Sequence, residues 1–159
     1  MEWKKTEVTY PDANRTLRLT YGQAMPISPR DAVHYSFETT LAGVIEKESI
    51  DDPFIVPPKL KDLWKNRDFG KYVDKKSNDI PVAFLTDNDI TNGNSGSPVI
   101  NGKGELLGCA FDGNWDGIIA DYYYQHEYNR TISVDVRYVL FLLDKFSGAQ
   151  HLLNEMVIR

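Results

Sequence analysis

The chain has 159 residues, of which 42% are hydrophobic and 26% charged, a composition typical of a globular protein with room for one sizeable core. Its formal net charge of -5 at pH 7 argues against binding to a nucleic-acid backbone, which attracts clustered Lys and Arg. No apolar run approaches the length of a membrane-spanning helix, so we expect no insertion into a membrane.

The first part of the chain predicts two strands joined by a turn. Residues 11–14 (Pro-Asp-Ala-Asn) supply the turn, and Leu17, Leu19 and Tyr21 alternate after it with the period of a strand. Residues 34–48 begin with an extended pattern and continue as a short amphipathic helix.

Residues 50–80 differ in character from the segments on either side. They contain Pro53, Pro57 and Pro58, then the charged stretch "KLKDLWKN", which predicts a helix, and then a polar stretch. We therefore expect a helical excursion near residues 55–75 that lies on the surface between the strands of a barrel.

Regular patterns return in the second half of the chain. Residues 80–89 predict a buried strand, 97–111 a β-hairpin that turns at 101–104, and 130–135 a further strand. The hairpin carries Cys109, whose apolar neighbours predict a buried core thiol. Because the chain has one cysteine, no disulfide can form within it.

The C-terminal part predicts helices. The apolar positions that repeat with the 3.6-residue period of a helix are Val136, Val139, Leu140, Leu143 and Phe146. Ser133 or Asp135 can cap the start of this helix, and Gly148 can end it. Together the elements predict a mostly β fold with residues 1–159 as a single domain. We expect a chymotrypsin-like six-stranded β-barrel, the second half of a double barrel, followed by C-terminal helices over 135–157.

One short string carries candidate chemistry. Residues 93–98, Gly-Asn-Ser-Gly-Ser-Pro, are similar to the loop that holds the nucleophile of chymotrypsin-like serine proteases. In those enzymes the N–H groups of the serine and of the glycine two residues before it stabilise the oxyanion, which here indicates Ser95 and Gly93. The alternative interpretation is a polar connector between two strands.

Two neighbours of the serine refine this interpretation. Zymogen-type proteases have Asp immediately before the serine, where it pairs with a newly formed N-terminal ammonium, whereas this chain has the uncharged Asn94. We therefore do not expect activation through that ion pair. Asp89 lies six residues before Ser95, the offset at which trypsin-type enzymes select Lys or Arg, although a turn residue is the favoured interpretation.

A serine nucleophile needs a general base, and the sequence does not supply an evident one. His34 lies in an extended segment, His126 in a polar loop and His151 in the terminal helix, and none has the Ala-Ala-His-Cys setting of a catalytic histidine. In a double barrel the histidine and aspartate come from the first barrel, so we expect them upstream of this chain. No side chain stands at metal-ligand spacing with His126 and Glu127, and we expect neither a metal nor a cofactor.

Longer segments resemble one family. These are "PDANRTLRLTYGQ", "SPRDAVHY", "DITNGNSGSPVINGKGELLGCAFDGNWD" and "RTISVDVRYVLFLLDKFSGAQHLLNEM". They are similar to the C-terminal part of bacterial dipeptidyl aminopeptidases of the dipeptidyl-peptidase 7 and 11 type, over most of the chain from about Tyr10 onward. In contrast, "DGIIADYYYQHEYN" departs from the family pattern, and the favoured role of its three consecutive tyrosines is to cover the barrel.

The resemblance implies an activity and a setting. Such enzymes are double barrels with an inserted helical domain, and they release dipeptides from the free N-termini of peptides in the periplasm or at the cell surface of Gram-negative bacteria. The implied partners are a peptide substrate, the upstream barrel and helical domain of the same enzyme, and a second copy in a homodimer of the full enzyme. Without the upstream histidine and aspartate, we expect this chain alone to be nearly inactive.

The resemblance also implies roles for four residues. Ser95 matches the nucleophile, Gly93 the oxyanion glycine, and Asp112 the carboxylate that holds the α-ammonium of the substrate. Gly113 matches the position that sorts the family by preferred side chain. Relatives that prefer acidic side chains have arginine there, so glycine predicts an apolar penultimate residue. Asp112 and Gly113 also form a common turn dipeptide.

Two alternatives for the function of the chain remain. One is a trypsin-like endopeptidase that uses Asp89, and the other is a non-catalytic binding module.

Overall fold

The computed structural model describes residues 17–120 and 122–159. The strands are β1 (Ile27–Arg30), β2 (Val33–Tyr35), β3 (Glu38–Thr40), β4 (Pro81–Thr86), β5 (Pro98–Ile100), β6 (Leu106–Gly113) and β7 (Thr131–Asp135). The α-helices are α1 (Leu41–Glu46), α2 (Pro58–Lys65), α3 (Val136–Phe141) and α4 (Gln150–Asn154), with a π-helical turn, Leu142–Phe146, between the last two. None of the helices in these ranges has the length and hydropathy to span a membrane.

The strands form two antiparallel sheets. Five strands pair in the order β3-β4-β7-β6-β5, while β1 and β2 form a separate hairpin. The fold is mostly β as predicted, but the described residues form no closed six-stranded barrel, which would require the first and last strands to pair. Here β3 and β5, each three residues long, are the two edges of an open sheet.

Local patterns predicted several elements correctly, among them β4, β7 and the hairpin of β5 and β6. Asn101 makes the hairpin turn, since its Oδ1 accepts the N–H groups of Lys103 (2.9 Å) and Glu105 (3.1 Å). Asp135 caps α3 by accepting the N–H of Arg137 at 2.8 Å. The turn and the cap depend on contacts between residues close in sequence, whereas β4 and β7 pair with each other across the chain.

The N-terminal segment differs from its prediction. The predicted turn at residues 11–14 lies outside the described residues. Leu17, Leu19 and Tyr21 alternate as expected, but they belong to no strand and are 100%, 84% and 88% exposed. The segment joins the sheet further on, where the Met25 N–H donates to the carbonyl of Leu85 at 3.2 Å.

The apolar core lies at the helical end of the sheet. Its buried members are Leu41, Val56, Leu60, Phe69, Tyr72, Ile80 and Phe141. Phe141 on α3 is fully buried and contacts the ring of Phe69 edge-on, with centroids 6.2 Å apart. Four of the seven, Val56, Leu60, Phe69 and Tyr72, come from the segment predicted to lie on the surface, so that placement is wrong: the segment supplies residues that pack against α3. The thiol of Cys109, predicted to be buried, is half-buried.

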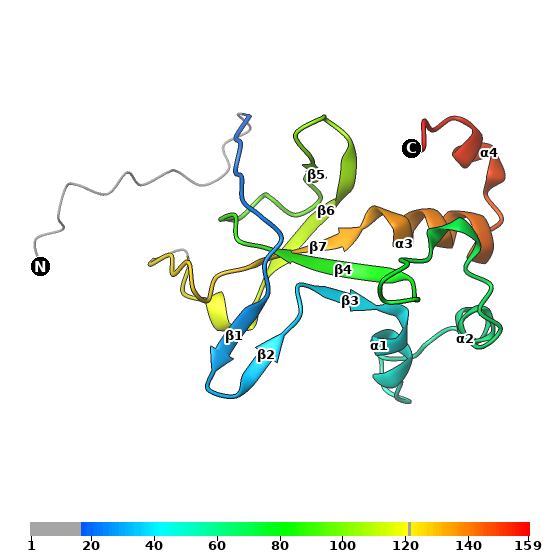
Figure 1. Cartoon of the computed structure of the whole chain (residues 1–159), viewed down its shortest axis with the longest axis horizontal. Coiled ribbons are helices and arrows are strands. Elements are labelled where there is room, and N and C mark those ends of the chain that lie inside the picture. The colour runs from blue at the N-terminus through cyan, green and yellow to red at the C-terminus, as the bar shows by residue number, and fades with distance from the viewer. Residues whose placement is uncertain (1–16, 121) are drawn as a thin grey trace, which may run out of the picture.

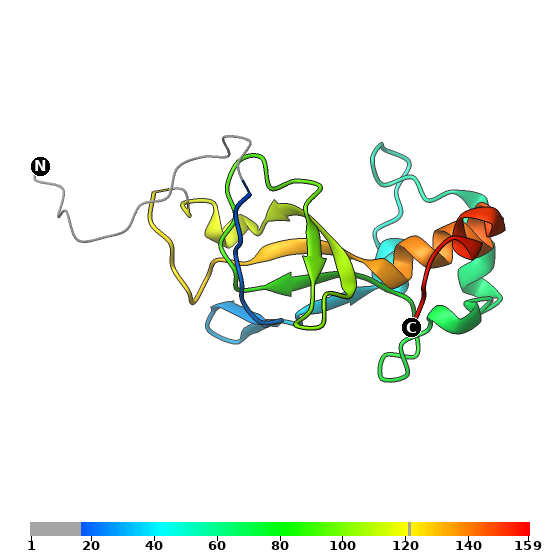
Figure 2. The same ribbon diagram turned by 90° about the horizontal axis from the view of Figure 1, so that it is seen from above.

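The two ends of the sheet differ in what surrounds them (Figures 1 and 2). The α-helices gather at one end, whereas the loops that precede β5 and β7 lie at the opposite end. Arg137 connects the sheet to the helical end through three carboxylates. Its guanidinium lies 2.7 Å from Asp135, 3.2 Å from Glu38 and 3.4 Å from Asp74.

Candidate active site

The serine loop, residues 91–97, connects the end of β4 to β5. Gly93 and Gly96 have φ angles of +93° and +89°, which side chains other than glycine rarely adopt, so the sharp turns of this loop require glycine. The loop is closed by backbone bonds from Asn94 N–H to the carbonyl of Thr91 (3.1 Å) and from Gly96 N–H to the carbonyl of Ala110 (2.8 Å). The loop therefore rests against β6.

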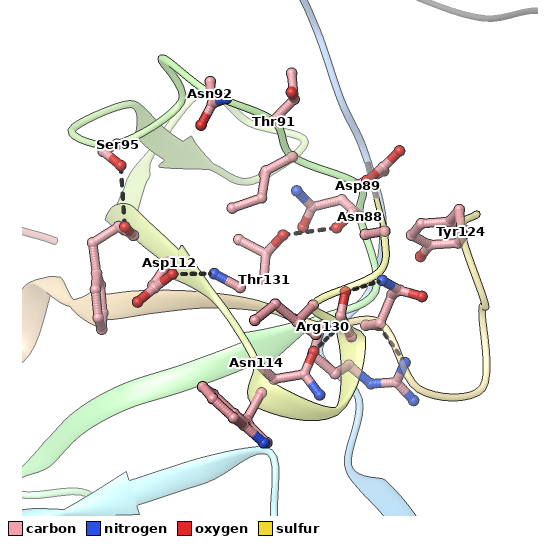
Figure 3. Close-up of a pocket in the computed structure, with 18 of the residues that line it drawn as sticks. Asn88, Asp89, Thr91, Asn92, Ser95, Asp112, Asn114, Tyr124, Arg130 and Thr131 are labelled. Atoms are coloured by element: carbon pink, nitrogen blue, oxygen red, sulfur yellow. Dashed lines mark hydrogen bonds between the residues drawn. The ribbon is translucent and has the colours of Figure 1, made fainter. Parts of the chain in front are cut away.

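Ser95 lies exposed at the tip of this loop. Its hydroxyl donates a hydrogen bond to the carbonyl oxygen of Phe111 on β6 at 3.1 Å (Figure 3). Within the described residues, the N–H groups of Ser95 and Gly93 have no acceptor. Two exposed amides next to an exposed hydroxyl are the groups that an oxyanion site needs.

A pocket of about 550 Å³ opens beside the serine. Gly93, Ser95, Asp112 and Gly113 all line it, so the structure brings together the four residues selected from the sequence. The remaining walls come from residues within 114–120 and 124–131, between β6 and the start of β7, and from residues 88–92, which follow β4 (Figure 3). The volume lies within the range of small-ligand sites.

Asp112 and Gly113 end strand β6 on the pocket side. The Asp112 carboxylate is exposed, and its Oδ1 accepts the N–H of Gly113 at 2.8 Å. A Cβ on Gly113 would lie 3.9 Å from its nearest neighbour, the carbonyl oxygen of Arg130, so the space beside this residue is open. The site thus offers a carboxylate and free volume at adjacent positions.

Arg130 forms a buried wall of the pocket and is 6% exposed. Its guanidinium donates to the carbonyl oxygens of Pro26 (2.9 and 3.2 Å), His126 (2.8 Å) and Asn129 (2.7 Å). Since its N–H groups point at backbone carbonyls, Arg130 holds the loop before β7 against the segment before β1. Among the described residues that line this pocket, Arg130 has the only positively charged side chain.

Two asparagines hold the rest of the 114–131 loop. The side chain of Asn114 accepts the backbone N–H of Arg130 at 2.7 Å and donates to the carbonyl of Tyr128 at 2.8 Å. The side chain of buried Asn129 donates to the carbonyl of Gly117 at 2.9 Å. Gly117 has no room for a side chain, because a Cβ there would lie 2.7 Å from Asn114 Oδ1. These contacts fix the wall that faces the serine loop.

Asp89 and Tyr124 lie on the side of the pocket away from Ser95 (Figure 3). The Tyr124 hydroxyl donates to the carbonyl of Asp87. Burial raises the pKa of Tyr124, and the carboxylates of Asp87 and Asp89 raise it further. Tyr124 is thus a pocket residue, contrary to the expectation that it covers a barrel, whereas Tyr122 and Tyr123 are exposed.

Within the described residues, no histidine is hydrogen-bonded to Ser95. His34 Nδ1 lies 3.1 Å from the hydroxyl of Ser28, and His126 Nε2 lies 3.6 Å from Asp87 Oδ2. His151 is exposed on the distant helix α4. Residues 17–120 and 122–159 hold no group of three or more side chains suited to bind a metal ion.

Sequence reasoning missed the residues that build the pocket without resembling a motif. Arg130, Asn129 and Asn114 are polar residues in a segment of irregular pattern, and their burial depends on partners far along the chain. The Phe111 carbonyl could not be identified because every residue has a backbone carbonyl, whatever its type. For Gly117 the sequence offered a weak signal, an isolated glycine in a loop.

An exposed serine between positive-φ glycines, on a mostly β scaffold and beside a pocket with a carboxylate, is an arrangement typical of serine-type peptidases. The sequence profile of the family Peptidase S46 matches residues 1–158. The chain therefore belongs to the Peptidase S46 family.

Individual relatives support this assignment. The chain is 53% identical over 158 residues to a "Dipeptidyl-peptidase 7" of Phocaeicola vulgatus, covering 99% of this chain and 22% of that relative. It is also 53% identical over 150 residues to an "Asp/Glu-specific dipeptidyl-peptidase" of Porphyromonas gingivalis, covering 94% of this chain and 21% of that relative. The chain thus spans about a fifth of the length of the curated relatives it matches.

A solved structure agrees. The crystal structure of Porphyromonas endodontalis DPP11 in complex with substrate superimposes with a TM-score of 0.87 at 44% identity. The match covers 96% of this chain and 22% of that one. The arrangement of strands and helices described above is therefore a part of the S46 peptidase fold.

Proposed function

We propose that this chain is the serine-bearing portion of a dipeptidyl peptidase, which releases dipeptides from the free N-termini of peptides. The observation that carries the proposal is the convergence of Gly93, Ser95, Asp112 and Gly113 on one pocket. The names of the S46 relatives support the reaction type, since they are dipeptidyl peptidases.

The proposed chemistry assigns each group one task. The Asp112 carboxylate binds the α-ammonium of the substrate, a strong charge-assisted contact that places the second peptide bond of the substrate at Ser95. Ser95 Oγ attacks that carbonyl carbon, its proton passes to a base, and the N–H groups of Gly93 and Ser95 stabilise the oxyanion. The base returns this proton to the leaving nitrogen as the adduct collapses and releases the shortened peptide, and water then hydrolyses the acyl-enzyme to free the dipeptide.

The base and its carboxylate partner are proposed to come from another part of a longer polypeptide. Ser95 donates to the Phe111 carbonyl rather than to a histidine, and the relatives are about five times as long as this chain. The same longer polypeptide would supply strands that complete the open five-stranded sheet as a chymotrypsin-like barrel. A location outside the cytoplasm remains a proposal that depends on the family resemblance.

The proposed preference is for an apolar penultimate side chain. An acidic side chain would need a cation in the pocket, and the guanidinium of Arg130 is engaged with backbone carbonyls. Gly113 contributes no charge and leaves space. Both features favour an uncharged side chain, because a buried carboxylate without a partner is costly.

A chimera tests the reaction. This chain replaces the matching 158 residues of the Phocaeicola vulgatus relative, and dipeptidyl substrates with free and with acylated N-termini are compared. We expect hydrolysis of the free substrate, its loss in Ser95→Ala, and little change in the matched control Ser97→Ala. Activity that survives Ser95→Ala would reject the nucleophile. Cleavage of the acylated substrate would favour an endopeptidase.

Two further variants of the chimera test the substrate contacts. Asp112→Asn removes the charge that pairs with the ammonium. Because bound substrate would cover this exposed carboxylate, we expect the fall in kcat/KM to correspond to a loss of about 2–5 kcal/mol in transition-state stabilisation. Gly113→Arg introduces a cation and should shift preference toward Asp or Glu, whereas Gly102→Arg in the hairpin turn should not. An unchanged preference in Gly113→Arg would contradict the assignment.

A further inference from the structure

The backbone bonds of the serine loop converge on Asn94, whose N–H donates to the carbonyl of Thr91 at 3.1 Å and whose carbonyl accepts the N–H of Ser97 at 2.9 Å. Glycines at positive φ, Gly93 and Gly96, flank Asn94 and Ser95, and the bonds from the loop to β6 come from Ser95, Gly96 and Ser97 rather than from Asn94. An oxyanion site works only if its N–H groups are already oriented when charge develops. Asn94 lies between the two candidate donors, Gly93 and Ser95, so a contact that holds Asn94 restricts the chain on which both amides lie.

The side chain of Asn94 is fixed from two directions. Its Oδ1 accepts the N–H of Thr91 at 3.1 Å and the guanidinium Nη2 of Arg18 at 3.3 Å. The first bond lies within the loop. The second comes from a segment 76 residues earlier in the chain, which makes it a long-range support.

The segment that carries Arg18 is itself anchored beside the loop. The Gln23 N–H donates to Asp87 Oδ1 at 2.5 Å, and the Asp87 N–H donates to the Gln23 carbonyl at 3.0 Å. Gly22 approaches so closely that a Cβ there would lie 2.6 Å from the Asn88 backbone nitrogen. The segment is therefore held at the residues that lead into the serine loop.

The orientation of Arg18 agrees with such a role. Leu17 and Leu19 on either side of it are exposed, while Arg18 is half-buried against the protein. We propose that Arg18 is a positioning residue that orients the oxyanion amides of Gly93 and Ser95 through Asn94. The inference rests on the proposed function, and it supplies a fixed support at the position where zymogen-type proteases use an Asp paired with an N-terminal ammonium.

The first test compares variants of Arg18 in the chimera, and it includes a conservative variant that should restore part of the activity. Arg18→Met keeps the length of the side chain and removes its donors, so we expect kcat to fall about 10- to 100-fold with little change in KM. Arg18→Lys should recover part of the loss, and the exposed neighbour variant Leu19→Gln should match the parent. The rate at which a fluorophosphonate labels Ser95 should fall in parallel with kcat, while the melting temperature stays unchanged.

Variants of Asn94 test whether Arg18 acts through that residue. Asn94→Asp retains the acceptor and should keep activity when Arg18 is present. Asn94→Ala removes the link, so adding Arg18→Met to it should cause no further loss, the non-additivity expected of groups that act together. Fully additive losses in the double variant, or equal kcat values in Arg18→Met and Leu19→Gln, would overturn the proposal.

Amide hydrogen exchange in this chain alone separates the two proposals. In Arg18→Met we expect faster exchange of the amides of residues 93–97 than in the parent and in Leu19→Gln. An inactive unaltered chimera would reject the proposed function, whereas unchanged exchange in Arg18→Met would reject the support by Arg18.

Discussion

The helical end and the pocket end of the molecule are held together by different forces. At the helical end, seven buried apolar residues from α1, α2, α3 and the segments on either side of α2 pack together. At the pocket end, buried polar groups such as Asn129 and Arg130 bond to backbone carbonyls, and the loop tips are exposed. Burial of apolar surface gives the first end its stability, and directional hydrogen bonds give the second its shape.

This contrast shows how the fold separates stability from chemistry. Strand β7 runs from the pocket at Thr131 to the cap of α3 at Asp135, so one strand connects the two ends. Changes at the helical end should therefore affect the free energy of unfolding, whereas changes at the pocket end should affect local order. Three predictions test this separation.

The largest effect is expected from Phe141→Ala at the helical end. Removing a fully buried phenylalanine should lower the free energy of unfolding by about 3–5 kcal/mol, from lost burial and the cavity that remains. The exposed Ser95→Ala should change it by less than about 0.5 kcal/mol. Urea unfolding followed by circular dichroism measures both, and similar values for the two variants would contradict the separation.

An intermediate effect is expected from Gly117→Ala at the pocket end. Its Cβ would lie 2.9 Å from both the Cα and the side-chain nitrogen of Asn129, so the loop must shift, at a cost of about 1–3 kcal/mol. Hydrogen exchange should increase in residues 114–130 and stay unchanged in α3. Gly102→Ala, which meets no atom within 4 Å, is the control. Increased exchange across the whole chain would instead indicate that the two ends unfold together.

The smallest effect is a pH dependence at the helical end. The backbone N–H of Ser77 is the main cause that lowers the pKa of Asp74, with help from Arg137 and against desolvation. A lowered pKa means that the carboxylate stabilises the fold above its unfolded pKa of about 3.9 and that this stability is lost as the pH falls through the folded pKa.

Thermal unfolding of Asp74→Asn tests this sign. The variant should be less stable than the parent at pH 7, and the two melting temperatures should converge below about pH 4. The exposed Asp51→Asn should follow the parent over the whole range. A difference between Asp74→Asn and the parent that grows on acidification would show that the sign is wrong.

The fold could be predicted from sequence where short-range chemistry decides the structure. The turn at Asn101 and the cap at Asp135 act within four residues, and both are confirmed. The strand expected at residues 17–21 failed because alternation alone cannot supply a partner strand. The segment that contains Phe69 and Tyr72 was misplaced at the surface because its burial depends on Phe141, more than 60 residues later.

The site could be predicted in part for the same reason. Ser95 and the glycines around it share one short loop, and Asp112 and Gly113 are adjacent, so two short strings contained four pocket residues. The supports of that pocket could not be found this way. Arg130 bonds to Pro26 and Arg18 to Asn94 across 104 and 76 residues, and nothing in the residue types indicates such pairs.

Strand β6 shapes how this protein can change over evolution. It pairs with β7 through an irregularity between Ala110 and Asp112, and Gly108 lies so close to the Val134 carbonyl that no side chain fits there. Gaining or losing one residue between Gly108 and Gly113 would move that glycine out of register and turn the carboxylate of Asp112 to the other face of the sheet. We therefore expect this strand to tolerate single replacements at its pocket end better than insertions or deletions within it.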